Sequence, residues 1–308
     1  MSILPGGRPA QAPKPGAKTS RRIGRAALPA VAVVAALVAF LVARNQAQGP
    51  DEATPPPAAG LPNTPDYHSL LVAPTDPNQL WLGTHVGIYE SLDGGRSWTF
   101  AGLEGQDAMN LGRTQEGTVW AAGHDVLARS SDGGKTWTSV RPEGLPGLDV
   151  HGFAIDPDSR SLLYAAVAGE GLYRSSDGGE SFELVSTDVG PGVLGMAVAP
   201  GGRLLAADPG QGLMASDDGG ATWSVVLPES VVGVAVSPGD PKMVVATGPG
   251  IFLSRDGGTT WSRVLSIDEG AGPVAWSPSD PDIGYVVGFD RTLYRTADGG
   301  ATWQPLDS

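Results

Sequence analysis

The sequence predicts an all-β fold, a six-bladed β-propeller of four-stranded blades, preceded by one N-terminal transmembrane helix and a Pro-rich linker. Three observations lead to this expectation: an octapeptide that recurs six times, 45 glycines and 27 prolines among 308 residues, and a single apolar run near the N-terminus. So much Gly and Pro with 6% aromatic residues is typical of turn-dense β proteins and unusual for helical bundles.

The apolar run, residues 26–43, contains no charged residue. As a helix rising 1.5 Å per residue it would span about 27 Å, close to the hydrocarbon thickness of a bilayer. Arg21, Arg22 and Arg25 precede it, which places that end in the cytoplasm. We therefore expect a basic cytoplasmic tail over residues 1–25, a signal anchor over 26–43 that makes the chain a single-pass protein of the cell membrane, and an extracytoplasmic remainder.

Two alternatives to an uncleaved anchor stay open. The run could belong to a cleaved signal peptide, although the region before it is long and no clean A-x-A site follows. Residues 20–22, Ser-Arg-Arg, also partly resemble a twin-arginine export signal, with Gly24 where that motif has an aromatic residue. Residues 44–66 carry six prolines and are predicted to form an extended, semi-rigid linker.

Composition excludes several classes of function. The chain has no cysteine, so it forms no disulfide, thiolate metal site or cysteine nucleophile. Residues 1–44 hold seven of the 20 basic residues and no acidic one, which leaves 13 basic and 33 acidic residues in 45–308, a net charge of −20. A domain this acidic repels phosphate backbones, so we do not expect nucleic acid as a partner.

The recurring octapeptide reads Ser-Leu-Asp-Gly-Gly-Arg-Ser-Trp in its first copy, residues 91–98. Asp-Gly between apolar runs is a strong hairpin signal, and the carboxylate can accept hydrogen bonds from its own turn. Six near-identical hairpins indicate a repeated structural element rather than six catalytic or calcium sites, so we interpret the aspartates as structural. They are Asp93, Asp132, Asp177, Asp218, Asp256 and Asp298, at spacings of 39, 45, 41, 38 and 42 residues.

Each repeat has room for four short strands, which is one propeller blade. In the first copy we expect strands over 67–73, 79–84, 88–91 and 97–101, and six such copies fill residues 67–308. The ring must close to bury the last sheet. Either the last blade is complete by itself, or residues 61–66 brace it.

The octapeptides resemble the Asp-box, or BNR, repeat of sialidases, sortilin-type receptors and photosystem II assembly propellers. The chain looks most like bacterial sialidase-like propellers that are often described as glycosyl hydrolases. The resemblance covers all six repeats and implies a propeller that binds or assembles something or, alternatively, a glycoside hydrolase of unknown linkage.

A true sialidase is not expected, because the sequence departs from that pattern. The Arg-Ile-Pro segment is absent, and the first inner strand reads His-Ser-Leu-Leu-Val-Ala-Pro instead, residues 68–74. The candidate substrate-gripping arginines stand one to three residues before the aspartate of an Asp box, on the hairpin side of the blades: Arg129, Arg174, Arg255 and Arg295. The candidate tyrosines occupy matched third-strand positions and are interpreted as packing residues: Tyr89, Tyr173 and Tyr294.

The four histidines are predicted to share the face opposite the Asp boxes. His68 and His151 each stand six residues before the proline that ends the inner strand of blades one and three. His85 and His124 stand at the second-strand ends of blades one and two. Asp290 occupies the matched position in blade six, which meets blade one when the ring closes.

This predicts an arc of four imidazoles and one carboxylate that binds a ligand or a transition metal, Zn or Cu. His68 and His85, in one blade, are expected to cooperate best. The matched positions in blades four and five are apolar or glycine, which makes the face lopsided: Leu194, Gly210, Val232 and Gly248. We therefore expect a module that binds a protein, glycan or metal without turnover.

The alternative, glycoside hydrolysis, needs two suitably spaced carboxylates on this face. The candidates are Asp107, Asp125, Asp149, Glu170, Asp208 and Asp290. No catalytic residue follows from the sequence.

Overall fold

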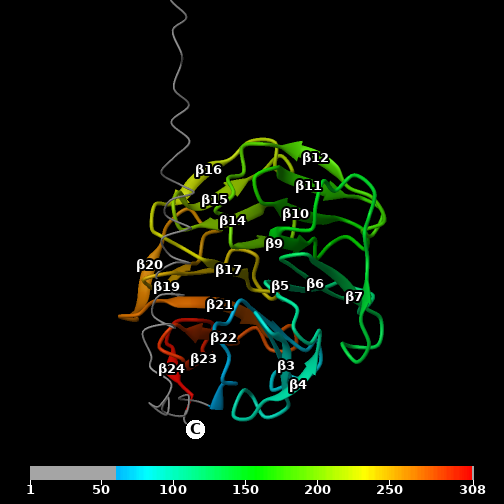
Figure 1. The fold of residues 1–308 in the computed structure, drawn as a ribbon. Helices are drawn as coiled ribbons and strands as arrows, with labels where there is room; N and C mark the ends of the chain where they lie inside the picture. The colour runs from blue at the N-terminus through cyan, green and yellow to red at the C-terminus, as the bar shows by residue number, and fades with distance from the viewer. Residues whose placement is uncertain (1–59, 307–308) are drawn as a thin grey trace, which may run out of the picture.

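The computed structural model describes residues 60–306, and these form 24 strands in six four-stranded antiparallel sheets. In each sheet the strands follow one another in chain order from the centre of the ring outwards (Figure 1). The six-bladed propeller predicted from the sequence is confirmed. The expected tail over 1–25, the transmembrane helix over 26–43 and most of the linker over 44–66 lie outside the described residues. Within 60–306, no helix has the length and hydropathy to cross a bilayer.

The four strands of the first blade agree closely with the predicted ones, and the next two blades follow the same plan. Blade one comprises β1 (Ser69–Val72), β2 (Leu80–Thr84), β3 (Gly87–Ser91) and β4 (Thr99–Gly102). Blade two comprises β5 (Asn110–Arg113), β6 (Val119–Gly123), β7 (Val126–Ser130) and β8 (Thr138–Ser139). Blade three comprises β9 (Val150–Ile155), β10 (Leu163–Val167), β11 (Gly171–Ser175) and β12 (Glu183–Ser186).

The last three blades repeat this plan. Blade four comprises β13 (Gly195–Val198), β14 (Leu204–Asp208), β15 (Gly212–Ser216) and β16 (Ser224–Leu227). Blade five comprises β17 (Gly233–Val236), β18 (Val244–Thr247), β19 (Gly250–Ser254) and β20 (Ser262–Ser266). Blade six comprises β21 (Ala271–Trp276), β22 (Ile283–Gly288), β23 (Leu293–Ala297) and β24 (Gln304–Pro305).

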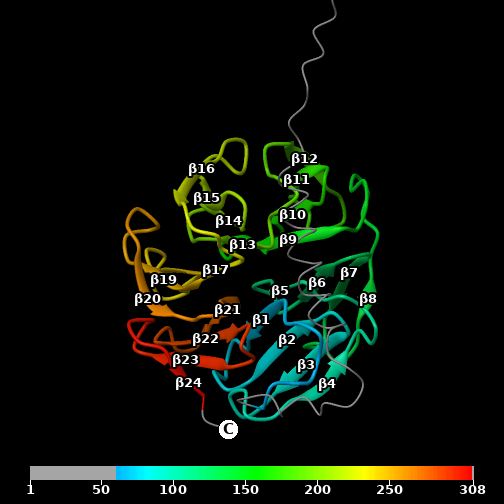
Figure 2. The same ribbon diagram turned by 60° about the vertical axis from the view of Figure 1, so that its left-hand side comes forward.

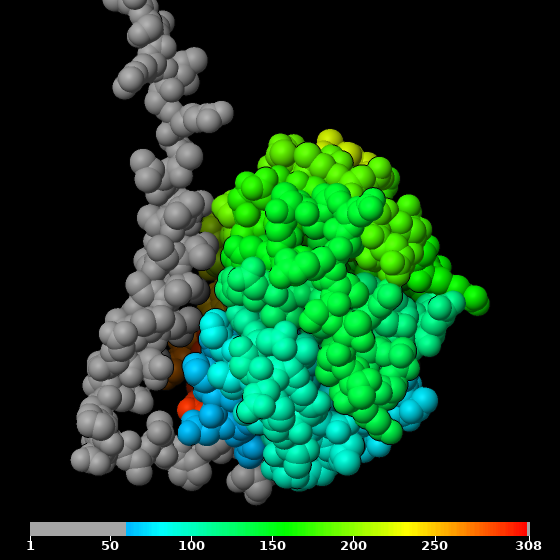
Figure 3. All heavy atoms as spheres, turned by 45° about the vertical axis from the view of Figure 1, so that its right-hand side comes forward, coloured from blue at the N-terminus to red at the C-terminus, as the bar shows by residue number. Residues whose placement is uncertain are grey.

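Blades are held together by apolar cores that lie between sheets. Six buried clusters occur in the described chain, and each draws its residues from two neighbouring blades. The inner strands β1, β5, β9, β13, β17 and β21 contact one another in that order, and β21 contacts β1. Figure 3 shows the surface of the first blade, blue to cyan, continuing without a break into the green segments that follow. The sheets therefore form a closed ring rather than an open stack.

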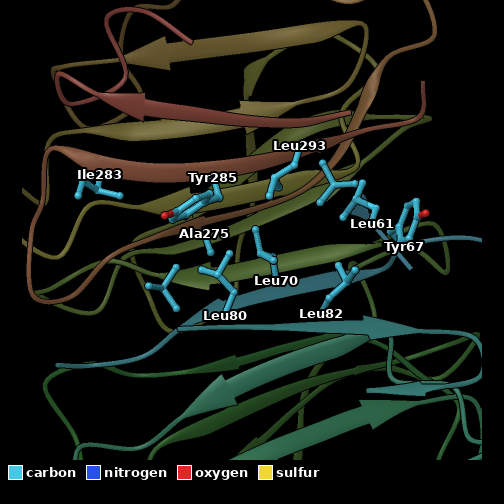
Figure 4. Close-up of a cluster of buried hydrophobic side chains, with 11 residues drawn as sticks. Leu61, Tyr67, Leu70, Leu80, Leu82, Ala275, Ile283, Tyr285 and Leu293 are labelled. Carbon is cyan, nitrogen blue, oxygen red and sulfur yellow. The ribbon is translucent and has the colours of Figure 1, made fainter. Parts of the chain in front are cut away.

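The ring closes without exchange of a strand. Blade six takes all four of its strands from the C-terminal end of the chain, and it lies beside blade one (Figure 2). Tyr285 and Leu293 of blade six pack against Leu80 and Leu82 of blade one in one buried cluster (Figure 4). The hydroxyl of Tyr285 also donates a hydrogen bond to the carbonyl of Pro77, at 3.0 Å. Side-chain packing between blades six and one therefore closes the ring, and no strand is shared between them.

The segment before β1 braces this junction. We call residues 61–68 the N-terminal brace. Leu61 and Tyr67 are buried in the apolar cluster between blades six and one. The hydroxyl of Tyr67 also donates a hydrogen bond to the carbonyl of Pro62 at 2.7 Å. The amide oxygen of Asn63 accepts a hydrogen bond from Arg291 of blade six at 2.9 Å. Blade six is therefore complete by itself, and the N-terminal brace also packs over the junction between blades six and one.

Each Asp box closes its own β-turn between the third and fourth strands. In the first, Oδ1 of Asp93 accepts hydrogen bonds from the backbone N–H groups of Arg96 and Ser97, both at 2.9 Å, and the indole N–H of Trp98 donates to the carbonyl of Gly95 at 3.0 Å. Equivalent carboxylate bonds recur at Asp132, Asp177, Asp218, Asp256 and Asp298. These carboxylates are occupied by their own turns, as a structural role requires.

A candidate metal site of four histidines and three aspartates

Four histidines and three aspartates gather at one end of the first three blades. We call this set the His–Asp cluster: Asp66, His68, His85, Asp107, His124, Asp149 and His151. Its members lie in the turn between the second and third strands of a blade or at the start of the first, inner strand. The Asp boxes lie in the turn between the third and fourth strands. In an antiparallel sheet these positions are opposite ends, so the cluster and the boxes lie on opposite faces of the ring.

The inner part of the cluster combines the brace with blade one. Nε2 of His68 lies 3.1 Å from Nδ1 of His85 and 3.2 Å from Oδ1 of Asp66. The backbone N–H of His85 donates to the Asp66 carboxylate at 3.3 Å, which fixes the turn against the brace. His68 and His85, the two imidazoles expected to cooperate, therefore lie in direct contact.

The outer part combines blades two and three. Nε2 of His124 lies 3.1 Å from Nε2 of His151 and 3.4 Å from Oδ1 of Asp149. His151 reaches this position because β9 bulges: Val150 and Gly152 pair with successive residues of β10 and leave His151 as the extra one. A bulge re-aims the side chain that it carries, so this strand turns its imidazole towards the neighbouring blade.

Asp107 joins the two parts. Its Oδ2 accepts a hydrogen bond from Nδ1 of His124 at 2.6 Å and lies 3.4 Å from Nδ1 of His85, while its Oδ1 lies 3.4 Å from Nε2 of His68. The side chain is 7% exposed, and among the described residues Oδ1 has no hydrogen-bond partner. Its neighbour Ala108 is anchored to blade one through both backbone groups, by Thr84 and Ser69. The carboxylate is therefore held rigidly between both groups of imidazoles.

Electrostatics favour the charged forms of the groups in the cluster. Burial raises the pKa of Asp66, but the hydrogen bond and charge of His68 and the charge of His85 bring it below its ordinary value. Burial likewise lowers the pKa of His68, while Asp66 and Asp107 raise it to a net increase. The hydrogen bond to Asp107 raises the pKa of His124. These shifts favour protonated rings at His68 and His124 in the metal-free chain. A metal that binds the ring nitrogens displaces those protons, and the three carboxylates then give the cluster a formal charge of −3.

Asp290, the carboxylate predicted to complete the arc, bonds within its own hairpin. Its Oδ1 accepts the backbone N–H of Thr292 at 3.0 Å, and its Oδ2 accepts the hydroxyl of Tyr294 at 2.8 Å. Burial, this hydrogen bond and the charge of Asp290 raise the pKa of Tyr294 to about 12. The structure therefore places Asp290 in a turn-capping pair, and Tyr294 is a poor nucleophile.

Three carboxylates of the cluster were not combined with the histidines at the sequence level. Asp66 fell in the Pro-rich linker, and Asp107 and Asp149 counted only as carboxylates of the same face. A repeat could have found them, because an aspartate stands two residues before a histidine or methionine in each of the first three blades. The three pairs are Asp66 with His68, Asp107 with Met109 and Asp149 with His151.

Asp208 and two of the arginines considered as substrate ligands bond elsewhere in the ring. Asp208 is buried but accepts hydrogen bonds from the backbone of Gly210 at 2.7 Å and Gln211 at 3.1 Å, within its own turn. Arg129 pairs with Glu180 in the Asp box of blade three at 2.8 Å, and Arg255 contacts the box of blade six through the carbonyl of Gly299. These arginines lie on the Asp-box face, away from the cluster.

Comparison with known proteins finds two family models that match parts of the chain. The family model described as Photosynthesis system II assembly factor YCF48 matches residues 64–207, and the BNR/Asp-box repeat model matches residues 252–263. Together with the observed ring of blades, these matches show that the chain is a BNR-type β-propeller. A comparison with curated protein sequences finds no match.

Two solved structures show the same fold at low sequence identity. The GH74 enzyme of Niastella koreensis aligns with a TM-score of 0.55 and 18% identity over 80% of this chain and 47% of that one. A structure of YCF48 bound to D1 peptide aligns with a TM-score of 0.51 and 18% identity over 84% of this chain and 86% of that one. The chain spans about half the length of the GH74 enzyme, and the likeness to both concerns the fold.

Proposed function

We propose that the chain is a metal-binding propeller that serves as a binding or assembly module, with its ligand face at the His–Asp cluster. The observation that carries the proposal is the convergence of four imidazoles and three carboxylates, including the buried Asp107, on one face. Imidazole and carboxylate donors together suit Zn, Cu, Fe or Ni. A scaffold without a ligand has no physical reason to concentrate costly buried charge over three of six equivalent blades.

Metal analysis of the 308-residue chain, purified under mild conditions without chelator, tests this proposal. We expect at least one equivalent of a divalent transition metal, and thermal unfolding at a higher temperature with Zn²⁺ than with EDTA, because a ligand that binds the native state stabilises it. A metal content below about 0.1 per chain, with no shift in unfolding on addition of Zn²⁺, would contradict it.

We further propose that the propeller works outside a membrane, tethered by residues 26–43, and that its partner is a protein or a glycan. The uncharged run and the arginines before it support the tether. The structure of YCF48 with D1 peptide shows that a propeller of this fold can receive a peptide. In intact cells, an epitope after Ser308 should be accessible to added protease while the chain stays in the membrane fraction. Release of a shortened chain into the medium would favour the cleaved signal peptide instead.

Glycoside hydrolysis is the weaker candidate. The carboxylates of the cluster are paired with imidazoles, and Asp208 and Asp290 cap their own turns. Incubation of the chain with a panel of chromogenic glycosides provides the test. Turnover that is lost on changing Asp149→Ala would replace the binding proposal with a hydrolase.

A further inference from the structure

The His–Asp cluster contains two separate sets of metal-donor atoms. The inner set comprises Asp66, His68, His85 and Asp107, and the outer set comprises His124, Asp149 and His151. Around a tetrahedral Zn²⁺ with bonds of about 2.0–2.1 Å, neighbouring donor atoms lie about 3.3 Å apart. The distances between donors in both sets can be compared with that value.

The inner set offers three mutually close donors, Asp66, His68 and His85, and a fourth carboxylate, Asp107, in contact with both imidazoles. From Nε2 of His68, the nearest donor atoms of Asp66, His85 and Asp107 lie at 3.2, 3.1 and 3.4 Å. From Nδ1 of His85, carboxylate oxygens of Asp66 and Asp107 lie at 3.5 and 3.4 Å. Both carboxylates face His68 through Oδ1 and His85 through Oδ2, so Asp107 is the fourth ligand that this set can supply. Four protein ligands are the arrangement of closed, structural zinc sites.

The outer set offers three donors at the same spacing. Nε2 of His124 and Nε2 of His151 are 3.1 Å apart, and Oδ1 of Asp149 lies 3.4 and 3.2 Å from them. The described residues supply no fourth donor to this group, and the side chains of His124 and Asp149 are 46% and 52% exposed, so the remaining position opens to solvent. Three protein donors with a free position are the arrangement of zinc sites that take an external ligand.

We propose that the cluster binds two divalent transition-metal ions at unequal sites, a closed inner site and an open outer site that completes its shell with a donor from a bound partner. This inference rests on the proposed function and extends it. The open site defines what the partner offers: a carboxylate or imidazole side chain, or another anionic oxygen, presented to the rim of blades two and three.

Asp107 connects the sites without bridging the ions. It is a ligand of the inner set, and it also accepts the Nδ1 proton of His124, which leaves Nε2 of that ring unprotonated and directed at the outer set. Carboxylates that orient a metal-bound histidine in this way raise its basicity as a ligand. The buried oxygen Oδ1, without a hydrogen-bond partner in the described chain, is directed towards His68 and the inner set.

The sites also join different parts of the ring. The inner one would tie the N-terminal brace to blades one and two through Asp66 and Asp107, directly beside the seam that the brace covers. The outer one would tie blade two to blade three. Occupation of the inner site therefore stabilises ring closure, whereas the outer site is free to exchange ligands.

Titration of the metal-free 308-residue chain with Zn²⁺, in competition with a chromogenic chelator, tests the proposal. We expect two equivalents bound by the native sequence. The double variant His68→Ala/His85→Ala removes both inner imidazoles, and Asp149→Ala/His151→Ala disables the outer set, so each should bind one equivalent. The control Asp290→Ala removes a carboxylate of the same face and should bind two.

Co²⁺ distinguishes the closed site from the open one. In the His68→Ala/His85→Ala variant, where Co²⁺ occupies the outer site, added imidazole should change the visible spectrum because it enters the free position. In the Asp149→Ala/His151→Ala variant, the spectrum should stay constant. Equal responses would overturn the distinction between sites.

The number of Zn²⁺ equivalents bound distinguishes failure of the two-site proposal from failure of metal binding itself. A single equivalent in the native sequence, lost in both double variants, would overturn the two-site proposal and leave metal binding intact. No binding at all would overturn both. Near-ultraviolet circular dichroism of each variant shows whether its fold is preserved. If a double variant unfolds, the single variants His85→Ala and Asp149→Ala replace it, because both side chains are half-exposed. Each single variant should lose affinity for metal at one site.

Discussion

His124 and Asp107 form the shortest contact in the His–Asp cluster, with 2.6 Å between Nδ1 of the imidazole and Oδ2 of the carboxylate. Although both belong to the second repeat, the residues lie on different segments: Asp107 precedes β5, and His124 occupies the turn between β6 and β7. A charged hydrogen bond of this length fixes the tautomer and the ring orientation of the histidine. The direction of the outer set of donors thus depends on a buried carboxylate of the inner set.

Changing Asp107→Asn should weaken metal binding throughout the cluster. The amide keeps the shape of the side chain but removes the charge, and its single carbonyl oxygen is a weaker acceptor for the N–H of His124 than a carboxylate. Loss of such a partner typically lowers metal affinity about 10- to 100-fold. Competition with a chromogenic chelator measures the effect for Zn²⁺.

The matched control for this variant is Asp208→Asn. Asp208 is also a buried carboxylate, 4% exposed, but its bonds are to the turn of blade four. Its replacement should lower stability without altering Zn²⁺ affinity. Equal affinities in the native chain and in Asp107→Asn would show that the carboxylate plays no part in the metal site.

The sequence was sufficient to predict the scaffold and the face of the histidines. The Asp-Gly turns fix the ends of third and fourth strands, and the strands between them follow by alternation, so β2 and β3 begin and end within a residue of the expected bounds. Repeat symmetry then assigns His68, His85, His124 and His151 to one face without any knowledge of packing.

The details of the site depended on features that composition and strand alternation do not reveal. Asp66 lies in a proline-rich stretch whose composition indicates a linker, yet Leu61 anchors that stretch in the core between blades six and one. His151 reaches its partner through a bulge, which alternation does not reveal. Asp290 occupies the repeat position that matches the histidines, but its carboxylate accepts a hydrogen bond from the Tyr294 hydroxyl of its own hairpin. Repeat alignment does not reveal such a local hydrogen bond.

Removal of the brace anchor should destabilise the propeller. Leu61 is 1% exposed in the cluster that closes the ring, so Leu61→Ala leaves a cavity and should cost about 2–5 kcal/mol in the free energy of unfolding. Urea denaturation followed by tryptophan fluorescence gives that value. The control Leu92→Ala, at a side chain that is 69% exposed, should change stability by less than about 0.5 kcal/mol. A similar loss in both variants would mean that residues 61–68 do not brace the seam.

Two adjacent glycines in the third Asp box should respond differently to alanine. Both have positive φ, +78° at Gly178 and +89° at Gly179, so each change costs roughly 1–2 kcal/mol in backbone strain. A Cβ at Gly179 would also lie 2.6 Å from Cη2 of the buried Trp120, whereas none of the described atoms lies within 4 Å of one at Gly178. Overpacking adds about 1–3 kcal/mol, so Gly179→Ala should lower the unfolding midpoint further than Gly178→Ala. Equal midpoints would rule out the close contact between this box and blade two.

Acid should destabilise the propeller between about pH 4 and pH 2 through its Asp boxes. Hydrogen bonds from the backbone and side chain of Thr136 and from Ser130 lower the pKa of Asp132 to about 2, and bonds from Thr222 and Ser216 do the same for Asp218. A carboxyl whose pKa is lower in the folded chain than in the unfolded one stabilises the fold above its unfolded pKa of about 3.9, and this contribution disappears as the pH falls through the folded pKa. The thermal unfolding midpoint, measured at constant ionic strength, should therefore fall steeply in this window, and less steeply in Asp132→Asn, which has one carboxylate fewer to protonate. A midpoint that stays constant from pH 5 to pH 2 would show that the boxes contribute nothing to stability through their charge.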